Sequence, residues 1–198
     1  RALRGTMTVY VSMLRAVNVG GTGLIKMDAL RELYESLGLA DVRTLLQSGN
    51  VLFRSDLKDR QRLAKRIVQE IERRFDLQVE VVVRTLAEIA SIVDRGPVLS
   101  PRADPRKLHV MFLSNVPDAA AQAALIKWHK DKQLKEMLEP RGPEVYLYYP
   151  DGMGRSKLTT GVIERYLDTP GTARNWNTLI KLVEVGRELE AKDRPSRS

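Results

Sequence analysis

The stretch T-V-Y-V-S-M-L, from Thr8 to Leu14, begins the pattern that decides the fold. Its β-branched and apolar residues are typical of a buried strand. After a glycine-rich loop over residues 15–26, apolar residues recur at helical spacing from Met27 to Leu37, and Gly38 supplies a left-handed stop. The chain is therefore predicted to open with a strand, a loop and a helix.

Two short strands follow as a hairpin, because the turn residues Ser48, Gly49 and Asn50 separate two β-branched and apolar runs. A second helix comes next, capped by Ser55 or Asp56, and a strand of alternating valines closes the unit. The expected ranges are 42–47 and 51–54 for the hairpin strands, 58–75 for the helix and 79–84 for the last strand. This β-α-β-β-α-β order is the split βαβ pattern of a ferredoxin-like fold.

A proline- and glycine-rich segment over residues 96–105 marks the predicted domain boundary. After it the order β-α-β-β-α repeats without an evident fourth strand, and one further helix ends the chain. The expected ranges are strand 108–113, helix 118–130, strands 134–138 and 144–149, helix 156–167 and helix 175–190. The predicted fold class is α+β, with two ferredoxin-like (α/β plait, βαββαβ) units in tandem and an extra C-terminal helix. The units are expected over residues 7–95 and 106–190, and residues 1–6 are interpreted as a cloning remnant.

The composition is that of a globular protein with a proper core, since 43% of the 198 residues are hydrophobic and 29% are charged. No apolar run approaches the roughly 20 residues of a membrane-spanning helix, and no segment resembles a signal peptide. The absence of cysteine excludes disulfides and thiolate chemistry. We expect a cytoplasmic protein with no membrane partner.

The formal net charge is +8, and the chain stays basic without Arg1 and Arg4. A positive surface attracts phosphates, RNA, DNA and anionic membranes without choosing among them. The alternative is that the charge serves solubility alone. The basic side of the helix over 58–75 is most simply a solvated surface.

The glycine-rich loop after the first strand is the first candidate ligand segment. Paired glycines, Gly20 and Gly21, allow backbone amides to point into one cavity and bind an anion. Arg15 and Lys26 would supply counter-charges, and Asn18 a polar contact. Alternatively the loop needs glycine only for positive φ, with Arg15 solvated.

The hairpin turn is the second candidate, with Gln47, Ser48 and Asn50 as ligand contacts. A nucleophilic serine needs a base, but the only histidines, His109 and His129, lie in no recognisable triad context. Because such a turn requires glycine and asparagine for backbone reasons, the structural interpretation is favoured over catalysis.

The third candidate segment contains Arg155, Ser156 and Lys157, between a predicted strand and a predicted helix. Backbone amides at a helix start, with two cations beside them, form a phosphate seat. The spacing is not that of a Walker A loop. In the alternative interpretation Ser156 simply caps the helix.

The fourth segment, Arg174, Asn175, Trp176 and Asn177, opens the last predicted helix. It gathers donors beside one aromatic ring, a composition suited to binding a base or a carboxylate. The alternative is a helix cap with Trp176 packed in the core.

No residues at ligand spacing predict a metal site, and no cofactor is expected. His109, on a predicted strand, is interpreted as a satisfied core residue. Tyr10 and Phe53 offer only thin support for RNA stacking on an open sheet face. Catalytic residues and oligomeric state are not predicted.

Five ordered motifs together resemble the bacterial family known as domain of unknown function 1697. They are L-R-A-V-N-V-G-G (14–21), Q-S-G-N-V-L-F (47–53), K-L-H-V-M-F-L (107–113), D-G-M-G-R-S-K-L (151–158) and T-A-R-N-W-N-T (172–178). Ala16 departs from the family, whose opening motif more often has glycine there. The resemblance implies tandem ferredoxin-like domains in a small cytoplasmic protein, and no established activity, substrate or catalytic residue.

The leading functional hypothesis is a binding protein for an anionic ligand, either a nucleotide or the phosphates of a nucleic acid. The competing hypothesis is an enzyme that acts on a phosphorylated or carboxylated small molecule, anchored by Arg15, Lys26, Arg155, Lys157 and Arg174. A third is an interaction module that pairs through exposed sheet edges and needs no pocket.

Overall fold

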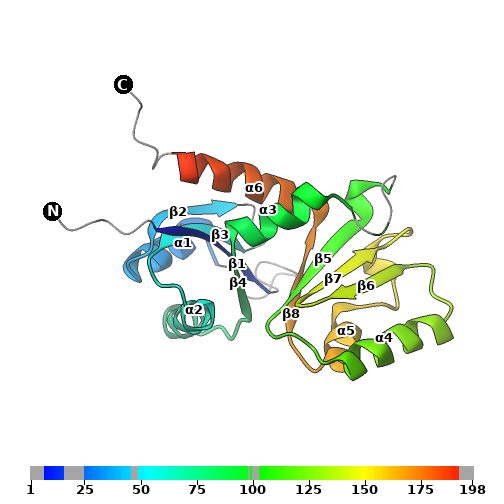
Figure 1. Cartoon of the computed structure of the whole chain (residues 1–198). Helices are drawn as coiled ribbons and strands as arrows, with labels where there is room; N and C mark the ends of the chain where they lie inside the picture. The colour runs from blue at the N-terminus through cyan, green and yellow to red at the C-terminus, as the bar shows by residue number, and fades with distance from the viewer. Residues whose placement is uncertain (1–6, 16–24, 46–48, 98, 100–102, 192–198) are drawn as a thin grey trace. The chain divides into compact units, whose positions relative to one another are not determined.

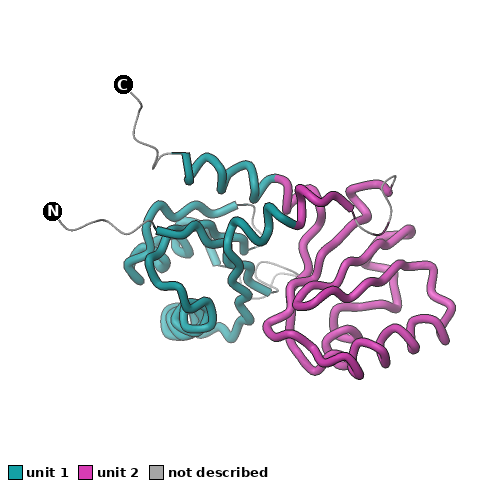
Figure 2. Tube along the Cα trace, in the orientation of Figure 1, with its two compact units in different colours: residues 1–91, 181–198 teal, residues 92–180 magenta. Residues whose placement is uncertain are grey.

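The protein is described from a computed structural model, which describes residues 7–15, 25–45, 49–97, 99 and 103–191. The chain forms two compact units (Figure 2). Unit 1 comprises residues 1–91 and 181–198, and unit 2 comprises residues 92–180. The C-terminal helix thus contributes residues 181–191 to unit 1. The domain boundaries expected from the sequence, 7–95 and 106–190, stay a prediction.

Unit 1 is built on a four-stranded antiparallel sheet with the order β2-β3-β1-β4 (Figure 1). Its strands are β1 (Thr8–Leu14), β2 (Ala40–Leu45), β3 (Asn50–Ser55) and β4 (Val81–Thr85). Its helices are α1 (Met27–Ser36) and α2 (Arg60–Phe75), followed by α3 (Leu86–Arg95). Every strand and helix expected in this half is present, with ends shifted by a few residues.

One face of the first sheet packs against α1 and α2. Tyr10 and Phe53 lie in this core with their rings stacked at 5.8 Å, and Tyr34 of α1 completes the aromatic group. The hydroxyl of Ser12 is 2.7 Å from that of Tyr34, which satisfies two buried polar groups. The two strand aromatics thus face the helices and offer no stacking platform for RNA.

The other face of the first sheet is buried as well. Val11 and Leu52 have no exposed surface, although strand alternation turns them away from α1 and α2. Figure 1 shows α3 and α6 (Trp176–Ala191) on the side of this sheet away from α2. Gly186 of α6 lies so close to Leu86 of α3 that a Cβ would come within 2.3 Å of it. The two helices therefore form a third layer over the sheet.

The cap expected for α2 was wrong. Asp59 caps the helix, accepting a hydrogen bond at 3.0 Å from the amide of Arg62. Ser55 instead accepts from the amide of Leu57 in the preceding turn. The helix therefore begins at Arg60, two residues later than the hydrophobic pattern indicated.

Unit 2 has a second four-stranded antiparallel sheet, with the order β6-β7-β5-β8. Its strands are β5 (Leu108–Leu113), β6 (Met137–Arg141), β7 (Glu144–Tyr148) and β8 (Gly171–Asn175), and its helices are α4 (Ala119–Asp131) and α5 (Thr160–Leu167). Two 3₁₀ turns, η1 (Pro105–Lys107) and η2 (Met153–Arg155), precede β5 and α5. Met111 and Leu113 pack with Leu125 and Ile163 in a core under the two helices.

The fourth strand of unit 2, β8, was missing from the sequence prediction. Its sequence G-T-A-R-N carries little β propensity, and it forms because it pairs along the free edge of β5. Gly171 is required at its start, since a Cβ would come within 2.8 Å of the Phe112 carbonyl oxygen. The final helix accordingly begins at Trp176.

The hairpin of unit 2 also differs from expectation. The strand predicted over 134–138 is β6, which runs from Met137 through Pro140 to Arg141 and turns at Gly142. Proline fits there because β6 is the edge strand, where one side of the backbone has no partner. The described residues thus form a mixed α+β structure with two four-stranded sheets and six α-helices.

Candidate functional site

Two of the four predicted segments meet at one end of the first sheet. The amide of Leu14, the last residue of β1, donates to the carbonyl of Gly49 at 2.9 Å, and the amide of Arg15 donates to that of Glu80. Asn50 is fully buried, with its side-chain amide 3.3 Å from the Leu45 carbonyl. The glycine-rich loop and the hairpin turn therefore begin side by side.

The other predicted residues of these two segments begin with Lys26. Lys26 is exposed immediately before α1, and its side chain makes no cap hydrogen bond. Asn18, Gly20, Gly21, Gln47 and Ser48 lie outside the described residues.

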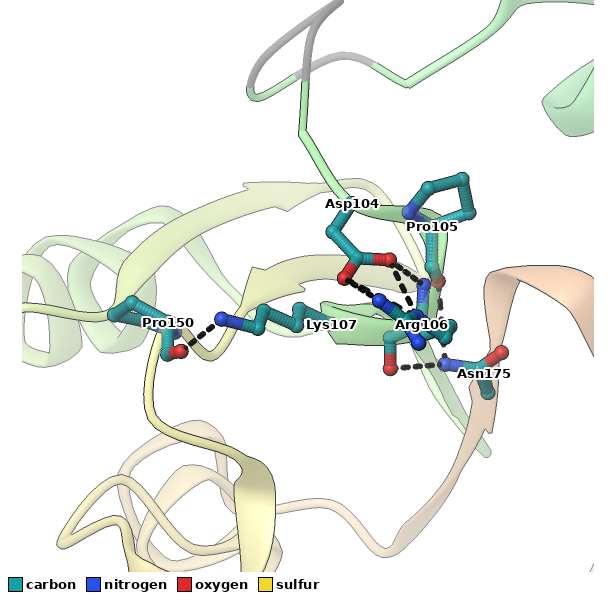
Figure 3. A network of polar contacts seen from close by, with 6 residues as sticks. All are labelled: Asp104, Pro105, Arg106, Lys107, Pro150 and Asn175. Atoms are coloured by element: carbon teal, nitrogen blue, oxygen red, sulfur yellow. Dashed lines mark hydrogen bonds and ion pairs between the residues drawn. The ribbon is translucent and has the colours of Figure 1, made fainter.

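The turn η1 contacts both Asn175 of the fourth segment and Pro150, at the start of the loop that carries the third segment (Figure 3). We call residues 104–107, this loop (149–157) and residues 175–177 the η1 end. The side-chain amide of Asn175 lies 2.8 Å from the carbonyl oxygen of Arg106 and 3.1 Å from that of Leu108. From the other side, the Lys107 ammonium donates to the Pro150 carbonyl at 2.5 Å. These contacts fix η1 between β8 and the loop after β7.

Asn175 reaches the carbonyl oxygens of η1 because it lies between a strand and a helix. It is the last residue of β8 and lies opposite His109 on β5. Its side-chain oxygen accepts from the amide of Asn177 at 3.0 Å, as an N-cap residue does. The same side chain therefore caps α6 and holds η1 in place through hydrogen bonds.

The loop after β7 is internally bonded. The hydroxyl of Tyr149 donates to the Leu158 carbonyl at 3.0 Å, and the amide of Leu158 donates to the Ser156 hydroxyl at 2.9 Å. The Ser156 hydroxyl also bonds to the carboxylate of Glu136. The loop that bears Arg155 is thus held in one conformation by its own contacts.

The helix expected to begin at Ser156 begins instead at Thr160, and Thr159 caps it by accepting from the amide of Val162 at 3.2 Å. The helix start therefore lies several residues beyond Arg155 and Lys157. Both of these side chains are exposed, and neither has a hydrogen bond or an ion pair within the described ranges.

Of the other charges at the η1 end, Lys107 donates to the neutral carbonyl of Pro150, and the rest form ion pairs. The Asp104 carboxylate accepts from the amide and the guanidinium of Arg106, with the shortest ion-pair distance at 2.9 Å. These bonds lower the pKa of Asp104 and raise that of Arg106. The exposed pair of Lys135 and Asp151, at 3.7 Å, contributes little because water screens it. Within the part of this region that the structure describes, Arg155 and Lys157 are the cations without a hydrogen bond or an ion pair.

Arg174 is separated from its neighbours in the fourth segment. Ala173 faces the core under α4 and α5, so strand alternation places Arg174 on the opposite face of the sheet. Its guanidinium donates to the Thr172 hydroxyl at 2.6 Å, and burial lowers its pKa to about 10. Trp176 is only 5% exposed, so it occupies the core position that the alternative interpretation of this segment predicted. Asn177, by contrast, is exposed.

His109 is a residue that the sequence interpretation assigned to the core as satisfied, and that assignment was wrong. Its Nδ1 atom is buried without a hydrogen-bond partner in the described part of the chain, and its ring meets Tyr149 edge-on at 5.5 Å. Burial lowers the pKa of this imidazole, and the Lys107 backbone opposes the shift only in part. The available signal was a single polar residue within the apolar run L-H-V-M-F-L.

Neither a metal centre nor a membrane span is found in the described ranges. These ranges contain no group of three or more His, Asp or Glu side chains that could hold an ion. None of their helices combines the length and the apolar character needed to cross a bilayer.

Comparison with known proteins shows the family. The chain is similar, with a TM-score of 0.65 and 19% identity, to the conserved bacterial protein SP0830 from Streptococcus pneumoniae. The alignment covers 91% of this chain and 99% of that one. Because the sequence identity is low, the likeness concerns the fold alone. No curated protein matches significantly. The model of one family matches residues 7–146, and the chain belongs to this family, described as Protein of unknown function (DUF1697).

Proposed function

We propose that the protein binds a phosphate-bearing small ligand, such as a nucleotide, at the η1 end of unit 2. The observation that carries this proposal is the pair of exposed, unpaired cations, Arg155 and Lys157, on a loop whose backbone is fixed by internal bonds. A cation on an ordered loop loses little conformational freedom when it binds an anion.

We further propose that each unit is a ferredoxin-like repeat. In both units the last strand has an arginine as its penultimate residue, and its last residue caps the helix that follows. Arg84 lies opposite Val11 on β1, and Arg174 lies opposite Val110 on β5, so their register positions correspond. Thr85 and Asn175, the next residues, each bond to the first turn of the following helix. Equivalent registers are what two copies of one βαββαβ unit would produce.

Burial of the sheet faces favours loops over sheets as the ligand site. Phe112 and Tyr146 lie on the face of the second sheet opposite α4 and α5, yet they are 0% and 4% exposed. Val11 of the first sheet is equally inaccessible. Because bases cannot stack on covered residues, readout of RNA on an open sheet is not supported.

An enzyme acting on a phosphorylated or carboxylated small molecule is the second candidate, and His109 is the observation that favours it. Its lowered pKa keeps the imidazole neutral at neutral pH, and its Nδ1 atom has no hydrogen-bond partner in the described part of the chain. It lies opposite Asn175 and therefore beside the η1 end.

A module that pairs through sheet edges receives less support, because two of the edges are protected. Edge strand β2 is interrupted by a bulge between Ala40 and Arg43, where Asp41 has a φ of 51°. Edge strand β6 contains Pro140. Both features discourage the addition of another strand.

Thermal-shift screening of the full chain against nucleotides and phosphorylated metabolites tests the proposal. We expect a ligand that raises the melting temperature of the wild type but not of the Arg155→Ala/Lys157→Ala variant. The matched control is Lys132→Ala/Arg165→Ala, which removes two exposed cations elsewhere in unit 2 and should keep the full shift. If no phosphorylated compound shifts the wild type, or if both variants respond alike, the η1 end is not the site.

A further inference from the structure

The outward side of α2 carries four cations, one glutamine and one exposed carboxylate, Glu72. Positions 62, 65, 66, 69 and 73 follow a helical spacing of three, four, seven and eleven residues, so they share one side of the helix. They are Arg62, Lys65, Arg66, Gln69 and Arg73, all of them exposed, and we call them the basic stripe. Leu63, Ile67 and Ile71 on the opposite side are buried in the core of unit 1.

The charge of the basic stripe is largely uncompensated. Arg62 and Lys65 have no side-chain hydrogen bond or ion pair within the described ranges. Arg66 donates to the carbonyl of Leu37 at 3.0 Å, a neutral acceptor. Only Arg73 has an acidic partner, Glu70, at 2.6 Å.

Helix stability explains Arg73 in the last turn of α2 but not the arginines at its start. The first turn of α2 has no acidic residue, and it carries two arginines, Arg60 and Arg62. Cations near a helix N-terminus are unfavourable because the helix dipole is positive there. The exposed side of α1 carries three acidic residues, Asp28, Glu32 and Glu35, and one arginine, Arg31. The excess positive charge therefore belongs to α2 and is not general to the helical face of this unit.

We propose that the basic stripe docks on the phosphate backbone of a DNA duplex without reading its sequence. This surface is independent of the proposed nucleotide site in unit 2. From Arg62 to Arg73 the stripe spans about 16 Å at a rise of 1.5 Å per residue, along which a DNA duplex presents about ten backbone charges. Charge complementarity over this length identifies the partner.

The composition of the stripe distinguishes among nucleic acids. It has no aromatic side chain, and binding of single strands relies on bases stacking on aromatic rings. Duplex RNA is recognised through 2′-hydroxyl contacts as well as phosphates, and the stripe has Gln69 as its single neutral polar side chain. A surface of four cations with a single carboxylate, Glu72, beside them fits phosphate contacts on duplex DNA.

Fluorescence anisotropy of a labelled DNA duplex of about 20 base pairs, titrated with the full chain across salt, tests the proposal. We expect the Arg62→Gln/Lys65→Gln/Arg66→Gln variant to bind at least roughly fivefold more weakly at low salt. The slope of log affinity against log salt should become shallower by about two to three, because each lost phosphate contact accounts for about 0.9. A lysine variant, Arg62→Lys/Arg66→Lys, should keep the affinity.

The matched control, Lys130→Gln/Lys132→Gln/Arg165→Gln, removes the same charge from exposed positions of unit 2. We expect it to bind like the wild type, and we expect the stripe variant to retain wild-type circular dichroism and any nucleotide-induced thermal shift. Equal losses in stripe and control variants would overturn the proposal, as would absence of DNA binding by the wild type. Stronger stripe-dependent binding to duplex RNA, or stripe-dependent self-association measured by light scattering, would also overturn it.

Discussion

The side-chain amide of Asn175 lies 2.8 Å from the main-chain oxygen of Arg106, although 69 residues separate the two positions. The contact joins the end of β8 to the turn before β5, and it is one of three carbonyl contacts of the same amide. A single asparagine thus holds together the region in which we place the ligand site.

Replacement of Asn175 should therefore destabilise unit 2. We expect Asn175→Ala to lower the free energy of unfolding by about 1–3 kcal/mol, because it removes a helix cap and leaves carbonyl oxygens without a donor. Chemical denaturation measures the loss. The control Asn177→Ala changes an exposed side chain and should stay within about 0.5 kcal/mol of the wild type. Equal effects of the two substitutions would contradict the bracing role.

Gly186 should tolerate no side chain. A Cβ there would come within 2.3 Å of a methyl group of Leu86, which is itself buried, so we expect Gly186→Ala to destabilise the protein by about 1–3 kcal/mol. An unhindered helical glycine would instead gain up to about 1 kcal/mol from alanine. Gly161→Ala, whose Cβ meets nothing closer than 3.9 Å, serves as the control. Thermal denaturation of both variants should show shifts of opposite sign.

The pH dependence of stability should include a contribution from His109. Burial lowers its pKa in the folded chain below the ordinary 6.5, so the unfolded chain binds a proton that the folded chain resists. Stability is therefore lost as the pH falls below about 6.5. We expect His109→Phe, which keeps an aromatic ring beside Tyr149, to lose less stability between about pH 7.5 and about pH 5.5. Identical pH profiles of unfolding would refute the contribution.

Charge substitutions along α2 should act on stability with opposite signs at its two ends. Arg62→Glu places a carboxylate near the positive helix N-terminus, and we expect a gain of about 0.3–1 kcal/mol. Arg73→Glu lies in the last turn beside Glu70 and should lose a similar amount, since it removes an ion pair and adds a like charge. Both should weaken DNA binding. If Arg62→Glu destabilised the helix, the dipole argument for the basic stripe would fail.

Local pattern was sufficient for most of the elements. The alternation of valines near β4 and the helical spacing of Leu63, Ile67 and Ile71 in α2 are properties of consecutive residues, so they could be recognised without knowledge of the fold. Element ends were less predictable, because Ser55, Asp56 and Asp59 are all chemically able to cap α2.

The candidate site depended on contacts that local pattern cannot reveal. The third and fourth segments were recognised as polar, yet whether Lys107 would bond to Pro150, 43 residues away, is not encoded in either neighbourhood. The unpaired Nδ1 of His109 likewise depends on Tyr149 and on strand pairing. Such facts follow from packing between distant parts of one unit.

The amino-acid sequence by itself determined the order of the strands and helices other than β8, and the basic side of α2, because hydrophobic periodicity and charge spacing act over a few residues. Only the tertiary structure decided that G-T-A-R-N becomes β8. It also decided that Arg174 lies on a sheet face while Asn175, at the end of the strand, forms hydrogen bonds to η1. The reason is physical. A segment of weak propensity takes its conformation from the hydrogen bonds offered by a neighbouring strand, and those bonds exist only once the chain has folded.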